Sequence, residues 1–128
     1  MTHERHDIGI ASQQGPYSDG VEVAGNKRWL FTAGTPGMTS DGTLPTEITG
    51  QAELAWQHIL KMLESAGMGI GDLVKITQYL VHAQDIPAYA KVRARVLGDA
   101  RPASMLMVVS ELPRPEFLIE IEACAAKE

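Results

Sequence analysis

Two carboxylates near the C-terminus carry the first chemical signal in the sequence. Apolar and polar residues alternate strictly over positions 119–124, which predicts a strand with Glu120, Glu122 and Cys124 on one face. Successive residues on one face of a strand lie about 7 Å apart. A glutamate that is partly desolvated in a cleft has a raised pKa and can act as a general acid or base. Ordinary glutamates on a solvated strand face fit the same pattern, so both interpretations stay open.

The histidines and the single cysteine offer little support for metal or thiol chemistry. His3 and His6 lie in a polar N-terminal stretch that we expect to be mobile, and His58 and His82 are isolated. A structural zinc site draws on four cysteine or histidine ligands at short paired spacings, which this sequence lacks. No neighbouring histidine or basic residue would activate Cys124 as a nucleophile. We therefore expect no metal site and a structural, buried thiol.

The elements that must position these groups follow from hydrophobic periodicity and from turn residues. Strands are predicted over residues 20–24, 29–33, 73–81, 103–109 and 117–124, and helices over residues 48–66 and 86–97. The dipeptide Gly25-Asn26 between the first two strands predicts a β-hairpin. Asp85 is the expected N-cap of the second helix, and Gly67 and Gly98 are expected to end the two helices.

The order of these elements predicts an α+β fold, in which a single mixed β-sheet carries both helices on one face. No repeat, linker or low-complexity segment divides the chain, so we expect residues 1–128 to form a single domain. The strand over 103–109 has apolar residues on both of its faces, as Leu106 and its neighbour Met107 illustrate. The sheet face without helices therefore needs a cover, and we expect other subunits to provide it.

Composition and charge restrict the class of function. The chain of 128 residues carries 16 acidic and 11 basic residues, for a net charge of -5, and its longest basic run is Lys27-Arg28. Nucleic acid is not an expected partner, because phosphate contacts need clustered positive charge. No stretch approaches the roughly 18 consecutive apolar residues of a membrane span, and the polar start does not resemble a secretory signal. With a single cysteine as well, we expect a cytoplasmic protein that does not bind membranes.

Three stretches give the chain a family resemblance. They are Gly15-Pro16-Tyr17-Ser18, Thr32-Ala33-Gly34-Thr35-Pro36, and Arg101-Pro102-Ala103 followed by Leu112-Pro113 and Ile119-Glu120-Ile121-Glu122-Ala123. On these motifs the chain resembles the RidA (YjgF/YER057c) family over nearly its whole length. The resemblance implies a chorismate-mutase-like fold and a homotrimer whose sheets form a central barrel, with small-molecule pockets at the subunit interfaces. It also implies hydrolysis of reactive enamines and imines, such as 2-aminoacrylate, to keto acids and ammonia without a cofactor.

The resemblance places several site positions of the family on this sequence. The catalytic positions are Glu120, which would activate the attacking water, and Tyr17 of the Gly-Pro-Tyr element. The substrate-binding positions are Ala33, Gly34, Ala90, Ser104 and Leu106. Ser104 stands where the family has the arginine that holds the substrate carboxylate. A charge-assisted hydrogen bond contributes about 1.5–3 kcal/mol, so an uncompensated serine should bind a small carboxylate poorly.

Two other arginines are candidates to replace the missing one. Arg101 precedes the strand that carries Ser104, and Arg114 lies in the loop after that strand. Two functions therefore stay open. The first is an enzyme that hydrolyses or deaminates an enamine or imine at an inter-subunit pocket with Glu120. The second is a non-catalytic ligand-binding or regulatory protein that has lost deaminase activity. A third function, ribonuclease activity, has little support in an acidic chain.

Overall fold

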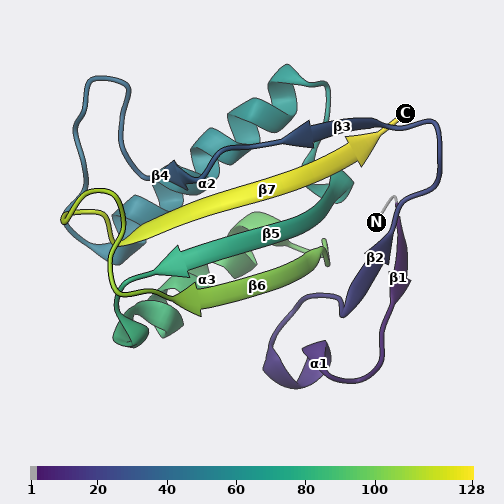
Figure 1. The fold of residues 1–128 in the computed structure, drawn as a ribbon, viewed down its shortest axis with the longest axis horizontal. Coiled ribbons are helices and arrows are strands. Elements are labelled where there is room, and N and C mark those ends of the chain that lie inside the picture. The colour runs from purple at the N-terminus through teal and green to yellow at the C-terminus, as the bar shows by residue number, and fades with distance from the viewer. Residues whose placement is uncertain (1–2) are drawn as a thin grey trace.

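A five-stranded mixed β-sheet is the main layer of the computed structural model, which describes residues 3–128 (Figure 1). Its strands are β3 (Arg28–Phe31), β4 (Thr35–Pro36), β5 (Leu73–Leu80), β6 (Ala103–Val108) and β7 (Ile119–Lys127). They lie in the order β3-β7-β5-β6, and β4 pairs with β7 as well. β5 and β6 run parallel, whereas β7 is antiparallel to β3, β4 and β5. The predicted α+β class and mixed sheet are confirmed.

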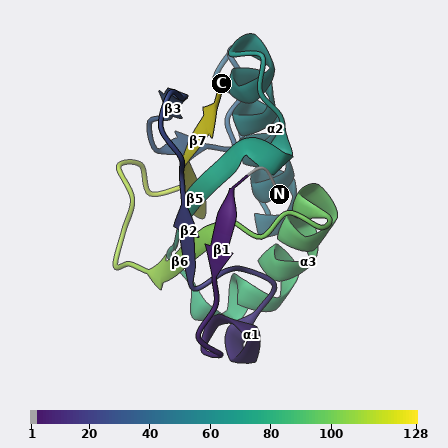
Figure 2. The same ribbon diagram turned by 90° about the vertical axis from the view of Figure 1, so that its right-hand side faces the viewer.

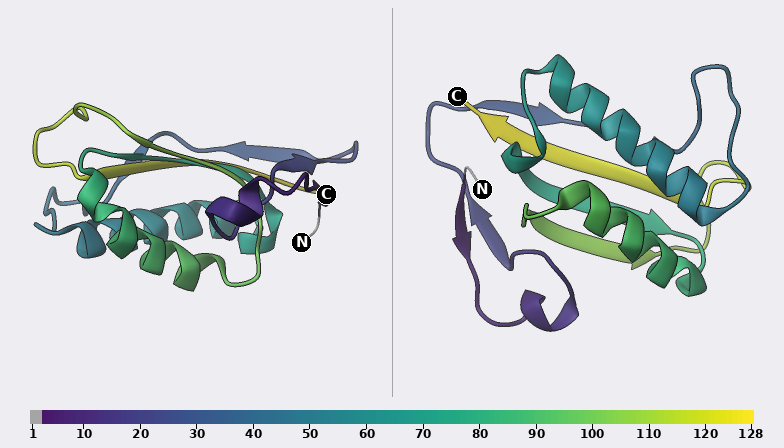
Figure 3. Two further views of the ribbon diagram at one scale, coloured as in Figure 1. Left: turned by 90° about the horizontal axis from the view of Figure 1, so that it is seen from below. Right: turned by 180° about the vertical axis from the view of Figure 1, so that it is seen from behind.

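Both long helices cover the same face of this sheet (Figures 2 and 3). They are α2 (Ile48–Ser65) and α3 (Ile86–Leu97). Fully buried side chains from α2, β5 and β7 form the centre of the core: Trp56, Ile59, Leu63, Ile76, Leu80, Ile119 and Ile121. Burial of each large aliphatic side chain contributes about 1.5–3 kcal/mol to the free energy of unfolding, so the packing of α2 against β5 and β7 stabilises the fold.

The helix boundaries follow the predicted signals closely. α2 ends just before Gly67, which has a φ of 71°, and α3 ends before Gly98, with a φ of 55°. Both values lie in the left-handed region that favours glycine after a helix. Asp85 does precede α3, but its side chain makes no capping hydrogen bond. A 3₁₀ turn, η2 (Ala83–Asp85), leads into the helix and holds Asp85 in a helical conformation instead.

The predicted hairpin is wrong. The strand β2 (Gly20–Glu22) pairs with β1 (Glu4–His6), and β3 pairs with β7. A tight type I′ hairpin needs positive φ at both central residues, but only Asn26 of the Gly25-Asn26 dipeptide has one, at 61°. The chain therefore turns without closing β2 onto β3, and the two strands join different sheets.

The N-terminal segment is anchored to the rest of the molecule rather than mobile from residue 3 onward. His3 is buried, and its Nε2 lies 3.0 Å from the backbone oxygen of Asp72 at the end of the 3₁₀ turn η1 (Ile70–Asp72). The short helix α1 (Ala11–Gln14) follows β1, and Asp19 accepts a hydrogen bond of 2.8 Å from the amide of Ala11. The expectation of a mobile terminus at His3 and His6 is therefore corrected.

The outer edge of β6 is covered only where the strand begins. Ser18 forms an isolated parallel bridge with Ala103, and its amide donates a hydrogen bond of 3.1 Å to the carbonyl of Pro102. β6 is the last strand of the main sheet on this side. Beyond the bridge, no strand of residues 3–128 pairs with this edge.

The sheet face opposite the helices exposes large apolar side chains. Phe31 is 72% exposed and Trp29 is 48% exposed, and their rings stack with centroids 5.9 Å apart. Met105 and Met107 of β6 are also exposed. This open face matches the uncovered face that the sequence predicts. Among residues 3–128 no helix combines the length and the hydrophobicity that crossing a membrane requires.

Candidate active site

Glu120 lies on the open face of the sheet, near the start of β7. The predicted alternation is confirmed, because Ile119 and Ile121 are fully buried while Glu120 is half-buried. In register, Glu120 lies beside Tyr79 of β5 and Pro36 of β4. Burial raises the pKa of the Glu120 carboxyl above its ordinary value. A rise in this direction brings a carboxyl group closer to the pKa that suits general acid–base catalysis.

Gly34 gives the Glu120 carboxylate room beside the backbone. A Cβ atom placed at Gly34 would lie 3.3 Å from Oε1 of Glu120, closer than most real contacts of a Cβ atom. The two residues that the resemblance assigns to one site are therefore neighbours. Ala33 precedes them and is exposed, and its carbonyl accepts hydrogen bonds from the hydroxyls of Thr32 and Thr35.

The buried side chain of Gln51 fixes the entry of the chain into β7. Its Nε2 donates to the carbonyls of Pro45, at 2.8 Å, and Glu116, at 3.0 Å. Its Oε1 accepts a hydrogen bond of 2.8 Å from the amide of Leu118. One amide from α2 thus satisfies three backbone groups. Those of Glu116 and Leu118 lie four and two residues before Glu120, and that of Pro45 lies three residues before α2. The sequence analysis did not identify this positioning residue, since a glutamine on a helix has no distinguishing spacing.

The second glutamate on this face has a different environment. The hydroxyl of Tyr79 donates a hydrogen bond of 3.1 Å to Oε1 of Glu122, and this bond is the main cause of the raised pKa of Tyr79. Within the described chain, residues 3–128, no hydrogen bond to the Glu120 carboxylate is found. Of the two glutamates on this face, Glu120 is therefore the one whose carboxylate is available for proton transfer.

A pocket of about 370 Å³ lies at the edge of the sheet, between α3, β6 and the N-terminal segment. Its lining residues are Gln14, Tyr17, Ile86, Arg93, Ser104, Met105 and Leu106. The pocket thus brings together three predicted site residues, Tyr17, Ser104 and Leu106. It also contains Arg93, which the sequence analysis did not select. Tyr89 and Arg93 lie four residues apart and share a helix face, but this spacing does not distinguish a pocket residue from any other residue of the helix.

Ser104 belongs to a buried hydrogen-bond network beneath this pocket. The Nε2 atom of Gln78 donates to the Ser104 hydroxyl oxygen and to the carbonyl of Met105, both at 2.9 Å. The hydroxyl of Tyr89 donates to Oε1 of Gln78. Gln78 is fully buried, and its amide is satisfied on both sides by these contacts. The network fixes Ser104 at the wall of the pocket.

Arg101 and Arg114, the two candidates to replace an arginine at position 104, lie outside this pocket. The guanidinium of Arg101 donates hydrogen bonds of 2.8 Å and 2.9 Å to the carbonyls of Gly98 and Ala100, at the C-terminal end of α3. Arg114 lies over the ring of Phe117, with its guanidinium carbon 5.7 Å from the ring centroid. Neither arginine lines the pocket that contains Ser104.

Ala90, the remaining predicted position, lies on α3 and is half-buried. It does not line the pocket beside Ser104, although its helix forms one wall of that pocket. A helix face rotates by a full turn every 3.6 residues, so a placement error of one residue moves a side chain to another face. Ala90 therefore differs from the strand positions, where the alternation of two faces limits the possible placements.

A single chain does not bring the two halves of the predicted site together. Glu120 faces the open side of the sheet, whereas Ser104 lies beside the buried Ile76 and points to the helix side. β5 lies between β6 and β7, and Glu120 is level with Met107 of β6, three residues along that strand from Ser104, so the two halves are separated both across the sheet and along the strands. The Glu120 half and the Tyr17–Ser104 half are therefore separate surfaces of one subunit.

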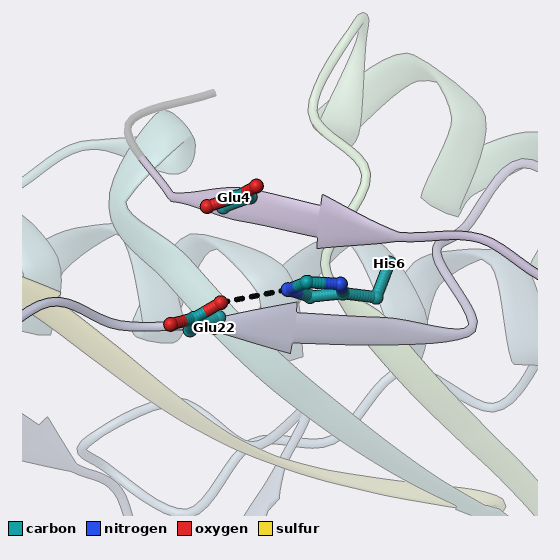
Figure 4. Close-up of side chains that lie close together, drawn as sticks. All are labelled: Glu4, His6 and Glu22. Carbon is teal, nitrogen blue, oxygen red and sulfur yellow. Dashed lines mark hydrogen bonds and ion pairs between the residues drawn. The ribbon is translucent and has the colours of Figure 1, made fainter.

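Two other groups were candidates for chemistry. Glu4, His6 and Glu22 place possible ligand atoms within 4.8 Å of one another on exposed strands, as Figure 4 shows. However, Nε2 of His6 already lies 2.7 Å from Oε1 of Glu22, and this contact raises the pKa of His6. Cys124 is half-buried, and burial raises the pKa of its thiol, which disfavours the nucleophilic thiolate. Neither group has the features of a built metal or thiol site.

Comparisons with known proteins agree on one group of relatives. The family model described as Endoribonuclease L-PSP matches residues 10–127. A RutC family protein of Pyrococcus horikoshii is 38% identical over 116 residues, which cover 89% of each chain. A protein of Escherichia coli named 2-iminobutanoate/2-iminopropanoate deaminase is 32% identical over 120 residues, which cover 88% of each chain.

A solved structure shares the fold over almost the complete chain. It is a protein of unknown function of the conserved Rid protein family, YyfB from Yersinia pestis. Its TM-score is 0.86 at 26% sequence identity, and the alignment covers 99% of this chain and 100% of the other. The similarity therefore extends to the N-terminal segment, β1 to β2, as well as to the main sheet.

Proposed function

This chain belongs to the RidA/YjgF family, and from that premise we propose that it hydrolyses a small imine or enamine without a cofactor. The relative named 2-iminobutanoate/2-iminopropanoate deaminase supports this class of reaction. In such a reaction, water adds to the carbon of the C=N bond, and the resulting carbinolamine releases ammonia. An imine and one water thus give one ketone and one ammonia.

Glu120 is the group proposed to move the protons in this reaction. Its carboxylate would accept a proton from the attacking water and return it to the departing nitrogen. The observation that carries the proposal is the half-buried Glu120 carboxylate over Gly34, with a pKa raised by burial. Tyr17 would contribute to the wall that closes the site around the substrate.

We further propose that the protein is a homotrimer whose subunits complete one another's sites. The open face exposes Phe31, Trp29 and Met105, which is a large apolar surface for a soluble chain. The separation of Glu120 from the pocket of Tyr17 and Ser104 supports the same assembly. Contact between neighbouring subunits would place the Glu120 half of one chain near the pocket half of another.

The test measures hydrolysis of freshly generated 2-iminobutanoate above its spontaneous rate, for the wild-type protein and two matched variants. Glu120→Gln should lower the rate about a hundredfold to ten-thousandfold, since it removes the proton-transfer group. Glu122→Gln is the control, because its amide oxygen can still accept the hydrogen bond from Tyr79. Equal rates for wild type and Glu120→Gln would refute the catalytic role.

A second candidate function follows from Ser104. The family resemblance assigns position 104 to the arginine that holds the carboxylate, but Ser104 is neutral, and its hydroxyl oxygen already accepts a hydrogen bond from Gln78. The alternative is therefore a non-catalytic or regulatory protein that binds a small molecule in the same pocket. Binding of an imino or keto acid without any acceleration of imine hydrolysis would favour this alternative.

A further inference from the structure

The pocket beside Ser104 contains a cation that comes from a different element. Among the described residues that line it, Arg93 of α3 is the only one with a positive charge. Its guanidinium carbon lies 5.6 Å from the centre of the Tyr89 ring, and a Cβ atom placed at Gly15 would lie 3.5 Å from its Nη2. Arg93 is therefore held between the helix and the Gly-Pro-Tyr segment that carries Tyr17.

The charge of Arg93 is not neutralised by an acidic side chain. No ion pair of Arg93 is found within residues 3–128. In contrast, Arg95, two residues further along the same helix, has its Nη2 atom 3.1 Å from Oε1 of Glu53. Arg93 is half-buried, so part of its solvation is already lost. An unpaired guanidinium in a pocket is suited to a planar carboxylate, which it can bind through two parallel hydrogen bonds.

Ser104 lines the same pocket, and its hydroxyl can donate a hydrogen bond there. The carbonyl of Met105 can only accept, so the nitrogen of the Gln78 amide must face it and the neighbouring Ser104 oxygen. Since the Ser104 oxygen accepts that hydrogen bond, its own proton is left to donate elsewhere. The pocket thus offers a guanidinium and a hydroxyl donor, which are groups that favour an anionic ligand.

We infer that Arg93, assisted by the Ser104 hydroxyl, holds the carboxylate of the substrate and replaces the family's arginine at position 104. This inference rests on the proposed function, because it assigns the carboxylate-binding residue of that reaction. Arg101 and Arg114 are not needed for this role, since Arg101 binds the end of α3 and Arg114 lies over Phe117. The substrate class is then a 2-imino acid rather than a neutral imine.

The experiment compares the binding of 2-oxobutanoate and its neutral amide, 2-oxobutanamide, by NMR titration of the intact protein. Arg93→Met should weaken binding of the acid roughly tenfold to a hundredfold, as expected for a lost charge-assisted hydrogen bond, and leave binding of the amide unchanged. Arg95→Met is the matched control on the same helix and should change neither. Arg93→Lys should retain part of the preference for the acid, because lysine keeps the positive charge but lacks the planar guanidinium that binds a carboxylate through two hydrogen bonds.

Retained binding of the amide by Arg93→Met shows that the variant keeps its folded pocket. Equal binding of the acid by Arg93→Met and Arg95→Met would overturn the inference, and so would a wild-type protein that does not prefer the acid to the amide. Hydrolysis assays separate this result from the proposed function. Arg93→Met should raise the KM for 2-iminobutanoate more than it lowers kcat, whereas failure of the proposed function means no hydrolysis by the wild type.

Discussion

Gly37 and Gly34, two glycines close to Glu120, differ in how much room they leave for a side chain. At Gly37 a Cβ atom would lie 2.0 Å from the backbone oxygen of Gln51, so α2 and the segment after β4 would have to separate. We expect Gly37→Ala to lower the free energy of unfolding by about 1–3 kcal/mol or more, as for overpacked cores. Urea unfolding monitored by circular dichroism measures this loss.

Gly34→Ala is the matched control for this prediction. Its Cβ atom would meet the Glu120 carboxylate at 3.3 Å, and this carboxylate can move aside. The free energy of unfolding should then change by less than about 0.5 kcal/mol, while imine hydrolysis slows because the Glu120 carboxylate is displaced. A Gly37→Ala variant as stable as Gly34→Ala would contradict the close packing of this segment on α2.

Strand periodicity predicts the face on which a site residue lies, but not the residues that surround it. The two-residue period of a strand assigned Glu120 to the exposed face, and the structure agrees. Arg93 could not be assigned in the same way, because its helix meets β6 and the N-terminal segment at an orientation that no local pattern specifies. The role of Gln78 could not be predicted for a similar reason. Only its hydrogen bonds with Ser104 and Tyr89 explain why a polar residue lies in a buried strand.

At the scale of elements, the paired strands β1 and β2 contain a group that titrates near neutral pH. The hydrogen bond from His6 to Glu22 raises the pKa of His6 above 6.5, and nearby Glu4 contributes less. The stabilisation of this strand pair is therefore fully present below pH 6.5 and is lost as the pH rises through the raised pKa.

NMR titration of the His6 ring measures this prediction. Glu22→Gln should lower the pKa of His6 more than Glu4→Gln does, because only Glu22 accepts its hydrogen bond. If Glu4→Gln had the larger effect, the assigned contact between β1 and β2 would be incorrect.

The long elements were predictable, whereas the short elements β1, β4 and α1 were not. α2, α3 and β5 have enough periodic residues for their boundaries to follow from pattern and glycine signals. β1 has three exposed polar residues and no apolar period, so it was missed. β7 continues to Lys127, beyond the predicted end at 124, because its alanine-rich end pairs with β3 although alanine has a low strand propensity.

At the scale of the whole molecule, the open sheet face determines the expected assembly. Phe31 is 72% exposed in the single chain, so a change there leaves the core intact. Phe31→Glu should convert the proposed trimer to monomers, since a buried interface would then contain an unpaired charge. Native mass spectrometry or sedimentation velocity measures the mass of the particle.

Leu60→Glu is the control for this assembly test. Leu60 is 37% exposed on α2, on the other side of the sheet, and its substitution should leave the proposed trimer intact. A Phe31→Glu protein with the same mass as the wild type would exclude the open face as the subunit interface.

The partly covered edge of β6 links assembly to the risk of aggregation. The bridge between Ser18 and Ala103 protects only the first residue of this strand. A free strand edge is a template for pairing with other chains, particularly when exposed side chains such as Met105 and Met107 are apolar. Where the proposed assembly also covers this edge, conditions that keep the chains associated would protect them from irreversible aggregation.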